Sequence, residues 1–166
     1  VKGEKWIAAV ATNWWAANRA LDRMSPVFET RGFLPHSDEI DTALSDALDD
    51  GPGVRFVSRG DTRGVFDKDN SIRARYHADA ALHAPIETRT ATAEYKDGSL
   101  ELWMATQAPV AAVQAAARML NIGQDRVTLY PMLSGGSFDR NLDNDIAGQV
   151  AQIAKQMGRP VQLVWS

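Results

Sequence analysis

TATAEYKDGSLELWMATQAPVAAVQAAARML, residues 90–120, predicts a β-hairpin followed at once by a helix. Strand-forming residues occupy both halves of the expected hairpin, 90–95 and 100–105. Asp97-Gly98 between them favours a tight turn, because this pair readily supplies the positive φ that such a turn requires. Pro109 suits the first turn of a helix, and the apolar residues that follow it recur at helical spacing. We therefore expect two antiparallel strands joined to a helix.

The same kind of pattern continues to the C-terminus. We expect a strand over 126–133, a glycine-containing loop, a helix over 142–157 and a final strand over 161–165. One face of the second helix is apolar: Ile146, Val150, Ile153, Ala154 and Met157. Hairpin, helix, strand, helix and strand in this order predict an α+β fold in which helices are layered on a mixed sheet.

Upstream of the hairpin, the pattern predicts a mixture of helices and short strands. An apolar run over 6–11 is typical of a buried strand, and Asn13 is a helix N-cap residue before the run 14–24. The segment 25–35 has the prolines and glycine of a linker. A second helix follows from Ser37, with its apolar stripe at Ile40, Ala43, Leu44, Ala47 and Leu48.

Three further segments lie between that second helix and the hairpin. Val54 to Ser58 resembles a short strand, and the Gly- and Asp-rich segment 60–70 resembles a loop. From Ser71 onward, apolar Ile72, Ala74 and Tyr76 alternate with polar residues, which is the period of a half-buried strand.

Composition excludes several classes of protein. Apolar residues make up 45% of the 166 residues and charged residues 23%, so the chain can build a globular core. A net charge of -3 and scattered Lys and Arg residues make nucleic acid a poor partner. The chain has no cysteine, so it provides no disulfide and no cysteine ligand for zinc or an iron–sulfur cluster. Its apolar runs are far shorter than the roughly 20 residues that span a bilayer.

The two ends of the sequence predict a piece of a longer polypeptide. The chain opens on Val1 rather than on methionine, and it closes on a strand-like run that reaches Trp165. The N-terminal residues do not have the pattern of a signal peptide.

The most unusual local sequence is Leu133-Ser-Gly-Gly-Ser-Phe-Asp-Arg140, between an expected strand and an expected helix. Gly135 and Gly136 allow the backbone to approach a ligand closely, and free N–H groups at a helix start favour anions. The sequence lacks the spacing of a Walker loop or a dinucleotide-binding loop. A plain connection between a strand and a helix is the alternative interpretation.

Two other polar segments flank the hairpin. His83 and Glu87 are four residues apart, but Pro85 between them argues against a helical metal site. Buried hydrogen bonds that organise a loop explain this pair better than direct catalysis. Gln107, at the junction of a strand and a helix, offers an amide that can donate to an oxo group and accept from water. A plain helix N-cap is the alternative for the segment Thr106-Gln107-Ala108-Pro109.

Taken in order, these segments resemble the molybdenum hydroxylases of the xanthine dehydrogenase and aldehyde oxidase family. In the large subunit of that family, the end of an α/β hammerhead domain is similar to residues 7–17 here. The molybdopterin-binding domain that follows shows four features in chain order: a His-x-x-x-Glu segment like 83–87, a Thr-Gln like Thr106-Gln107, a Gly-Gly-x-Phe-Gly loop like 135–139, and a strand like 160–165. The likeness covers nearly the whole chain and is greatest to the bacterial isoquinoline 1-oxidoreductase type.

The resemblance implies a domain organisation and a set of contact residues. Residues 1–35 would be the end of the hammerhead region and its linker, and 36–166 the N-terminal part of the molybdopterin-binding domain. Gln107 would lie beside the molybdenum centre, with His83 and Glu87 supporting the residues that touch it. The loop would contact the cofactor through Gly135, Gly136 and Phe138.

The resemblance also implies an activity and partners. Members of the family are oxidoreductases that hydroxylate an N-heteroaromatic or aldehyde carbon with water and pass electrons to [2Fe–2S] clusters. The cofactor would be molybdopterin, as the cytosine dinucleotide, with molybdenum. The partners would be a [2Fe–2S] small subunit and the remainder of the large subunit, with no nucleic acid and no membrane span in this segment. The bacterial periplasm or cell envelope is favoured over the cytoplasm.

Two departures from the family pattern lead to an alternative. Asp139 stands where the family loop usually has glycine, and its charge lies near a site meant for an anionic cofactor. The family's catalytic glutamate follows a Gly-x-Gly motif that is absent from 71–166, so we expect no catalytic residue and no protein ligand to the metal in this segment. The isolated chain should therefore be inactive and free of cofactor. The alternatives are a cofactor-free binding domain that keeps the fold, and a small acid–base hydrolase using His83 with Glu87 or a nearby Asp.

Overall fold

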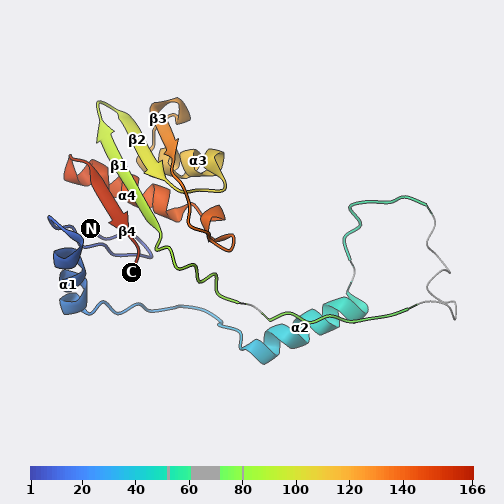
Figure 1. The fold of residues 1–166 in the computed structure, drawn as a ribbon. Coiled ribbons are helices and arrows are strands. Elements are labelled where there is room, and N and C mark those ends of the chain that lie inside the picture. The colour runs from blue at the N-terminus through green and yellow to red at the C-terminus, as the bar shows by residue number, and fades with distance from the viewer. Residues whose placement is uncertain (52, 61–71, 80) are drawn as a thin grey trace. The chain divides into compact units, whose positions relative to one another are not determined.

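The computed structural model describes residues 1–51, 53–60, 72–79 and 81–166. Internal contacts divide the chain into two units, one formed by Val1–Pro26 with Ala80–Ser166 and the other by Val27–Asp79 (Figure 1). The first unit holds the sheet with helices α1, α3 and α4, and the second holds helix α2. The domain boundary between residues 35 and 36 stays a prediction from the sequence.

A mixed sheet forms the centre of the first unit. Its strands are β1 (Thr90–Lys96), β2 (Ser99–Met104), β3 (Val127–Pro131) and β4 (Val161–Val164). They lie in the order β3-β2-β1-β4, with β1 antiparallel to both β2 and β4 and with β2 parallel to β3 (Figure 1). The mixed sheet confirms the α+β class predicted from the sequence.

The predicted hairpin is β1 and β2. Lys96 pairs with Ser99 across the turn, which places Asp97-Gly98 at its tip. Both turn residues have positive φ, 49° and 78°, as a two-residue turn between twisted strands requires. The hairpin prediction is confirmed, with strand ends shifted by one residue.

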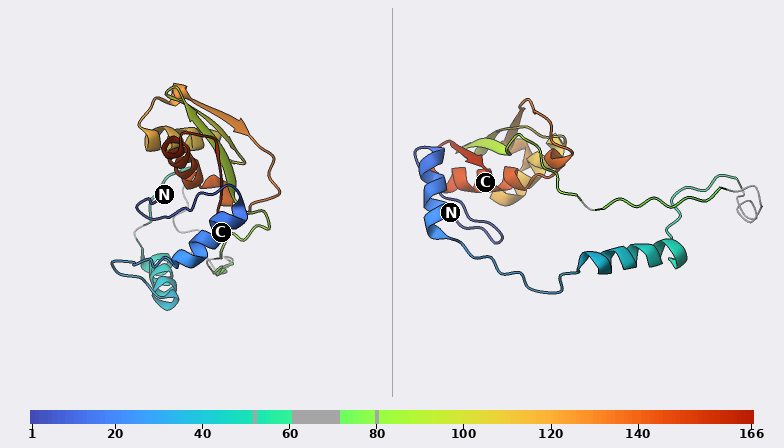
Figure 2. Two further views of the ribbon diagram at one scale, coloured as in Figure 1. Left: turned by 90° about the vertical axis from the view of Figure 1, so that its left-hand side faces the viewer. Right: turned by 60° about the horizontal axis from the view of Figure 1, so that its bottom comes forward.

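Two helices cover one face of the sheet: α3 (Pro109–Leu120) and α4 (Asp145–Met157) (Figure 2). Small residues let them approach closely, since a Cβ added at Gly148 of α4 would lie 3.3 Å from Met119 Cε of α3. Alternate strand residues fill the core beneath them: Ala91, Ala93, Leu100, Leu102 and Met104. Within the described ranges, no helix has the length and apolarity needed to cross a bilayer.

The start of α4 differs from the prediction. The helix begins at Asp145 rather than at residue 142, and a short 3-10 helix, η2 (Arg140–Leu142), precedes it. The Asp143 side chain accepts a hydrogen bond from the Asp145 N–H at 2.9 Å, so the backbone between the two helices follows a side-chain turn instead of the helical path. Strand β3 is shorter than predicted at both ends: a 3-10 turn, η1 (Gln124–Arg126), includes residue 126, and residues 132–133 are not in the strand.

The N-terminal helix α1 (Trp14–Met24) has the predicted bounds. Asn13 caps it as expected, since its side-chain oxygen accepts from the Ala16 N–H at 2.9 Å. The predicted strand over 6–11 is wrong, because only an isolated bridge between Lys2 and Ile7 forms there. An apolar run becomes a strand only where a neighbouring strand supplies hydrogen-bond partners, and none of the described strands pairs with this run.

Helix α2 (Ser37–Asp50) in the second unit also has the predicted position. The strands predicted over 54–58 and from Ser71 onward are wrong for the described residues, which are not in strands; Ser71 itself and 61–70 of the predicted loop lie outside them. Instead, Arg75 donates to Ser45 Oγ at 3.1 Å and forms an ion pair with Asp49. Arg75, a polar residue of this alternating segment, therefore contacts helix α2 rather than a neighbouring strand.

We predict that His77 in this second unit titrates at a higher pH than a free histidine. The hydrogen bond that the protonated His77 ring donates to the Asp79 carboxylate raises the pKa of His77 above its ordinary value of 6.5, and the charges of Asp79 and Asp41 act in the same direction. The contact therefore stabilises the folded chain fully below about pH 6.5, and this contribution is lost as the pH rises through the raised pKa.

An NMR titration of the His77 imidazole tests this prediction. Asp79→Asn removes the main cause and should move the pKa back toward 6.5. Identical titration curves for the wild-type chain and this variant would contradict the prediction.

Candidate functional site

The sheet topology brings three distant segments to one edge. Strands β2 and β3 are parallel, so the residues that follow them emerge at the same edge, where Met104 pairs with Pro131. Because β1 is antiparallel to β2, the segment that precedes β1 reaches this edge as well. Residues 81–89, Thr106-Gln107 and the loop 133–139 therefore converge there. Ligands of open α/β sheets commonly bind outside the carboxyl ends of parallel strands.

Gln107 is joined to the glycine loop by both ends of its amide. Its Nε2 donates to Asp139 Oδ1 at 3.0 Å, and its Oε1 accepts from Ser137 Oγ at 2.9 Å. The Gln107 backbone N–H donates to the Asn141 carbonyl at 3.1 Å. The structure thus brings Gln107 and the predicted loop together, although 30 residues separate Gln107 from Ser137.

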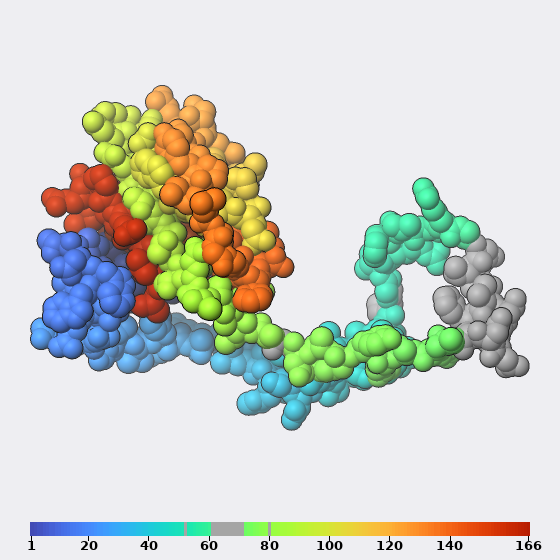
Figure 3. Space-filling view, in the orientation of Figure 1, coloured from blue at the N-terminus to red at the C-terminus, as the bar shows by residue number. Residues whose placement is uncertain are grey.

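Glu87 contacts the other end of the same loop. Glu87 is half-buried as a residue, and its carboxylate accepts a hydrogen bond from the Gly135 N–H. After Gly135 the chain turns through Gly136, which has φ of 101°, and through Phe138, which has φ of 46°. The Phe138 side chain is 76% exposed. In the space-filling view the segment that contains these loop residues, in orange, lies on the surface (Figure 3).

Arg89 anchors the C-terminal side of the loop and was missed by the sequence analysis. Its side chain, 9% exposed as a residue, donates to the carbonyl of Arg140 at 2.6 Å and also to the carbonyl of Asp143. Burial lowers the pKa of Arg89, and the charge of Asp143 opposes this shift. Such a guanidinium stays charged and supplies donors in a fixed fork.

Trp165 packs against this arginine from the end of β4. The guanidinium of Arg89 lies 5.1 Å from the centroid of the Trp165 ring, and that of Arg140 lies 5.3 Å from it. Trp165 is itself fixed, because its indole N–H donates to Gln149 at 2.8 Å. The sequence did not predict this role, because Arg89 appears there only as a charged residue next to a strand and belongs to no recognisable motif.

Thr106 and Asn141 complete the support of the loop. Thr106 Oγ1 donates to Asn144 Oδ1 at 3.2 Å, and Asn141 Nδ2 donates to Ser134 Oγ at 3.0 Å. The N-cap of α3 is Ala108, and it makes no side-chain capping bond. Thr106 Oγ1 also accepts a hydrogen bond from the Ala108 N–H at 3.0 Å, at the start of α3. The segment is therefore a helix start but not only that, because Gln107 binds the glycine loop and Thr106 also bonds Asn144.

His83 does not join this cluster in the way that the sequence indicated. It is exposed, and the structure records no hydrogen bond for it among the described residues. The expected buried hydrogen bond of His83 is therefore wrong, whereas Glu87 does organise the loop. Residues 81–89 are not helical, which agrees with the argument from Pro85. The roles of His83 and Glu87 in supporting a cofactor stay predictions.

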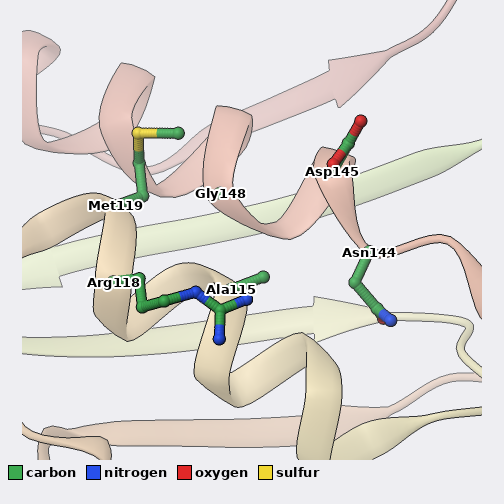
Figure 4. A pocket seen from close by; sticks show the side chains of 6 residues that line it. All are labelled: Ala115, Arg118, Met119, Asn144, Asp145 and Gly148. Carbon is green, nitrogen blue, oxygen red and sulfur yellow. The ribbon is translucent and has the colours of Figure 1, made fainter.

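Two cavities are described in this unit, and only the smaller one touches the site. A groove of about 380 Å³ lies between α3 and the start of α4, where Figure 4 shows Arg118 and Asp145 on facing elements. It contains none of the predicted site residues. A cavity of about 10 Å³ lies beside Glu87, Arg89 and Gly136, which is room for about one water molecule.

Comparison with known families agrees with this arrangement. The profile of the molybdopterin cofactor-binding domain matches residues 48–166, which include Gln107 and the whole loop. The chain belongs to this family. The molybdopterin cofactor-binding domain therefore accounts for most of its length, and the resemblance to molybdenum hydroxylases is confirmed.

Named relatives of this family member include several oxidoreductases. The chain is 34% identical over 90 residues to the beta subunit of isoquinoline 1-oxidoreductase of Brevundimonas diminuta, covering 54% of this chain and 12% of the relative. It is 28% identical over 164 residues to a membrane-bound aldehyde dehydrogenase (pyrroloquinoline-quinone) of Gluconacetobacter polyoxogenes, covering 96% and 21%. One subunit of the nicotinate dehydrogenase of Pseudomonas putida matches at 24% identity, covering 72% of this chain and 10% of the relative.

A solved structure shares the fold. Quinoline 2-oxidoreductase from Pseudomonas putida 86 matches with a TM-score of 0.52 and 24% sequence identity. The match covers 66% of this chain and 14% of that one. The chain thus spans about a fifth or less of the length of the relatives that it matches.

We predict that Gly135→Ala disrupts the contact between Glu87 and the loop. A Cβ at this position would lie 2.6 Å from Glu87 Oε2, closer than real Cβ atoms come. The carboxylate must move, and the loss of its hydrogen bond should lower the free energy of unfolding by about 1–2 kcal/mol. The backbone N–H at 135 should also exchange about tenfold faster with solvent, as hydrogen exchange monitored by NMR would show.

Glu87→Gln is the matched control for this prediction, because it keeps an acceptor of the same shape and should change the exchange rate less. Unchanged exchange at position 135 in the alanine variant would count against the proposed contact.

Proposed function

We propose that this chain forms part of the wall of a molybdenum–molybdopterin site in a larger oxidoreductase. The observation that carries the proposal is the meeting of Gln107 with the glycine loop at one edge of the sheet. Membership of the molybdopterin cofactor-binding domain family supports it, as do the names of the relatives.

The donor groups of the site fit an oxygen-rich ligand. Among the described residues, the structure records no hydrogen-bond partner for the backbone N–H groups of Gly136, Ser137 and Phe138. A Cβ added at Gly136 would meet nothing within 4 Å, so the space in front of this backbone is open. Unpaired N–H groups on an exposed loop are suited to phosphate or another anionic, oxygen-rich group.

When bound, a molybdenum–pterin group would supply the hydroxylation of an N-heteroaromatic or aldehyde carbon with oxygen from water. The residues of this chain would hold and orient that group. Gln107 would donate an N–H to one of its oxygens, and the loop would offer backbone donors. Arg89 and Glu87 would fix the loop from its two ends, which is the preorganisation that such a site needs.

The proposal includes the partners and the compartment expected from the family resemblance. The full protein would pass electrons to a [2Fe–2S] small subunit, would use the cytosine dinucleotide form of the cofactor, and would function in the bacterial periplasm or cell envelope. Iron analysis, nucleotide release by acid and cell fractionation would each test one of these points.

The first experiment is an elemental analysis for molybdenum in the full-length protein, purified with any partner subunit. We expect about one molybdenum per chain, and at least about a tenfold loss in Gly136→Ala, because the added methyl group enters the open space before the loop. Gly98→Ala is the matched control: Gly98 also has positive φ and open space, but it lies in the β1–β2 turn. Equal molybdenum content in the two variants would contradict the proposed contact.

A cofactor-free binding domain is the second candidate. It is favoured by one observation, the bond between Gln107 and Asp139, because this bond satisfies part of the amide within the chain. A full-length protein that contains no molybdenum under conditions in which related oxidoreductases load it would support this candidate over the first.

A further inference from the structure

The amide of Gln107 is held by two side chains of different chemistry. Asp139 accepts from Nε2 at 3.0 Å, and the Ser137 hydroxyl donates to Oε1 at 2.9 Å. All three side chains belong to the edge where β2 and β3 end. The two contacts do not constrain the amide equally.

Only the aspartate distinguishes the two ends of the amide. An ionised carboxylate accepts hydrogen bonds and cannot donate them, so it tolerates Nε2 but repels Oε1. A serine hydroxyl turns to donate or to accept, and it fits either end. If the amide were flipped by 180°, Ser137 would adapt, whereas Asp139 would face an oxygen.

The backbone at Asp139 is compatible with this role. Asp139 has φ of 65° and ψ of 4°, the left-handed region, directly after Phe138 with φ of 46°. Aspartate and asparagine enter this region more readily than most residues that carry a side chain. An aspartate can therefore stand where the family pattern has glycine, and it adds a charged acceptor that glycine lacks.

We propose that Asp139 is a positioning residue that fixes the orientation of the Gln107 amide. One N–H of Nε2 binds the Asp139 carboxylate, Oε1 faces Ser137, and the second N–H of Nε2 is left for a ligand. Gln107 then presents a donor to its ligand, and the matching ligand atom is one that accepts hydrogen bonds, such as an oxygen. The choice of ligand rests on the proposed function; the orientation of the amide does not.

NMR of the isotopically labelled full 166-residue chain tests the orientation without any cofactor. In the wild-type chain, nuclear Overhauser contacts should join the Gln107 side-chain amide protons to Asp139 in a single pattern, with solvent exchange slowed about tenfold. In Asp139→Asn, either end of the asparagine amide can face Gln107, so both orientations should be populated to similar extents. In Asp139→Gly the slowed exchange should be lost.

Asp97→Gly is the matched control, because Asp97 also has positive φ but lies at the tip of the hairpin. It should leave the Gln107 signals unchanged. Unaltered signals of the β1–β2 hairpin in the Asp139 variants would show that they fold. If Asp139→Asn keeps the single pattern and the slow exchange, the carboxylate does not orient the amide and the proposal is overturned.

The two proposals fail in different ways. A chain that shows the Asp139-dependent pattern while the full-length protein lacks molybdenum would keep the positioning role and reject the cofactor site. A protein that contains molybdenum but whose Gln107 signals do not respond to Asp139 would reject the positioning role alone.

Discussion

Replacing Arg89 with alanine should lower the free energy of unfolding by about 3 kcal/mol. The substitution removes the donors to the carbonyls of Arg140 and Asp143, and each hydrogen bond to a charged group contributes about 1.5–3 kcal/mol. The two bonds share one guanidinium, so their contributions are not fully additive. Urea unfolding of the chain, followed by circular dichroism, would measure the change.

Two further arginine variants serve as comparisons for this test. Arg89→Lys keeps the charge but not the planar fork, so it should lose about half as much stability. Arg118→Ala, an exposed arginine on α3, should change stability by no more than about 0.5 kcal/mol. If Arg89→Ala and Arg118→Ala were equally stable, Arg89 would not anchor the loop.

Leu102→Ala should cost about 3–4 kcal/mol. Leu102 lies on β2, which is an interior strand of the sheet, and none of its surface is exposed. Removing three buried carbon atoms loses their transfer free energy and leaves a cavity that close-packed helices can fill only in part. The same urea experiment would measure the loss.

Leu133→Ala is the matched control for the core substitution, because Leu133 is 98% exposed in the glycine loop. It should change stability by about 0.5 kcal/mol or less. A small effect of Leu102→Ala would mean that this core is not packed as described.

Local sequence patterns predicted most of the elements that the structure contains. Asp97-Gly98 marked the hairpin because few residues adopt positive φ, and Pro109 marked the start of α3 because proline fits the first helical turn. Asn13 marked the start of α1 by its side-chain cap. These signals are short in range, so the sequence carries them without knowledge of the fold.

Patterns that depend on a distant partner were predicted less well. The apolar run over 6–11 and the alternating residues after Ser71 have strand character, but the described strands do not pair with them. Arg75 and His77 instead meet the polar side of α2. A periodicity of two shows that alternate side chains differ, but not which element lies beside them.

For the site, the sequence by itself determined which residues carry unusual chemistry: Gln107 before a helix, two glycines after a strand, and a charged Asp139 in place of glycine. Only the tertiary structure decided that Gln107 binds Asp139 and Ser137, that Glu87 rather than His83 reaches the loop, and that Arg89 anchors it. These contacts join residues 30 to 51 positions apart. They exist because strands β2 and β3 run parallel and end at one edge, a pairing that is set by the burial of the sheet against α3 and α4 and not by any local pattern.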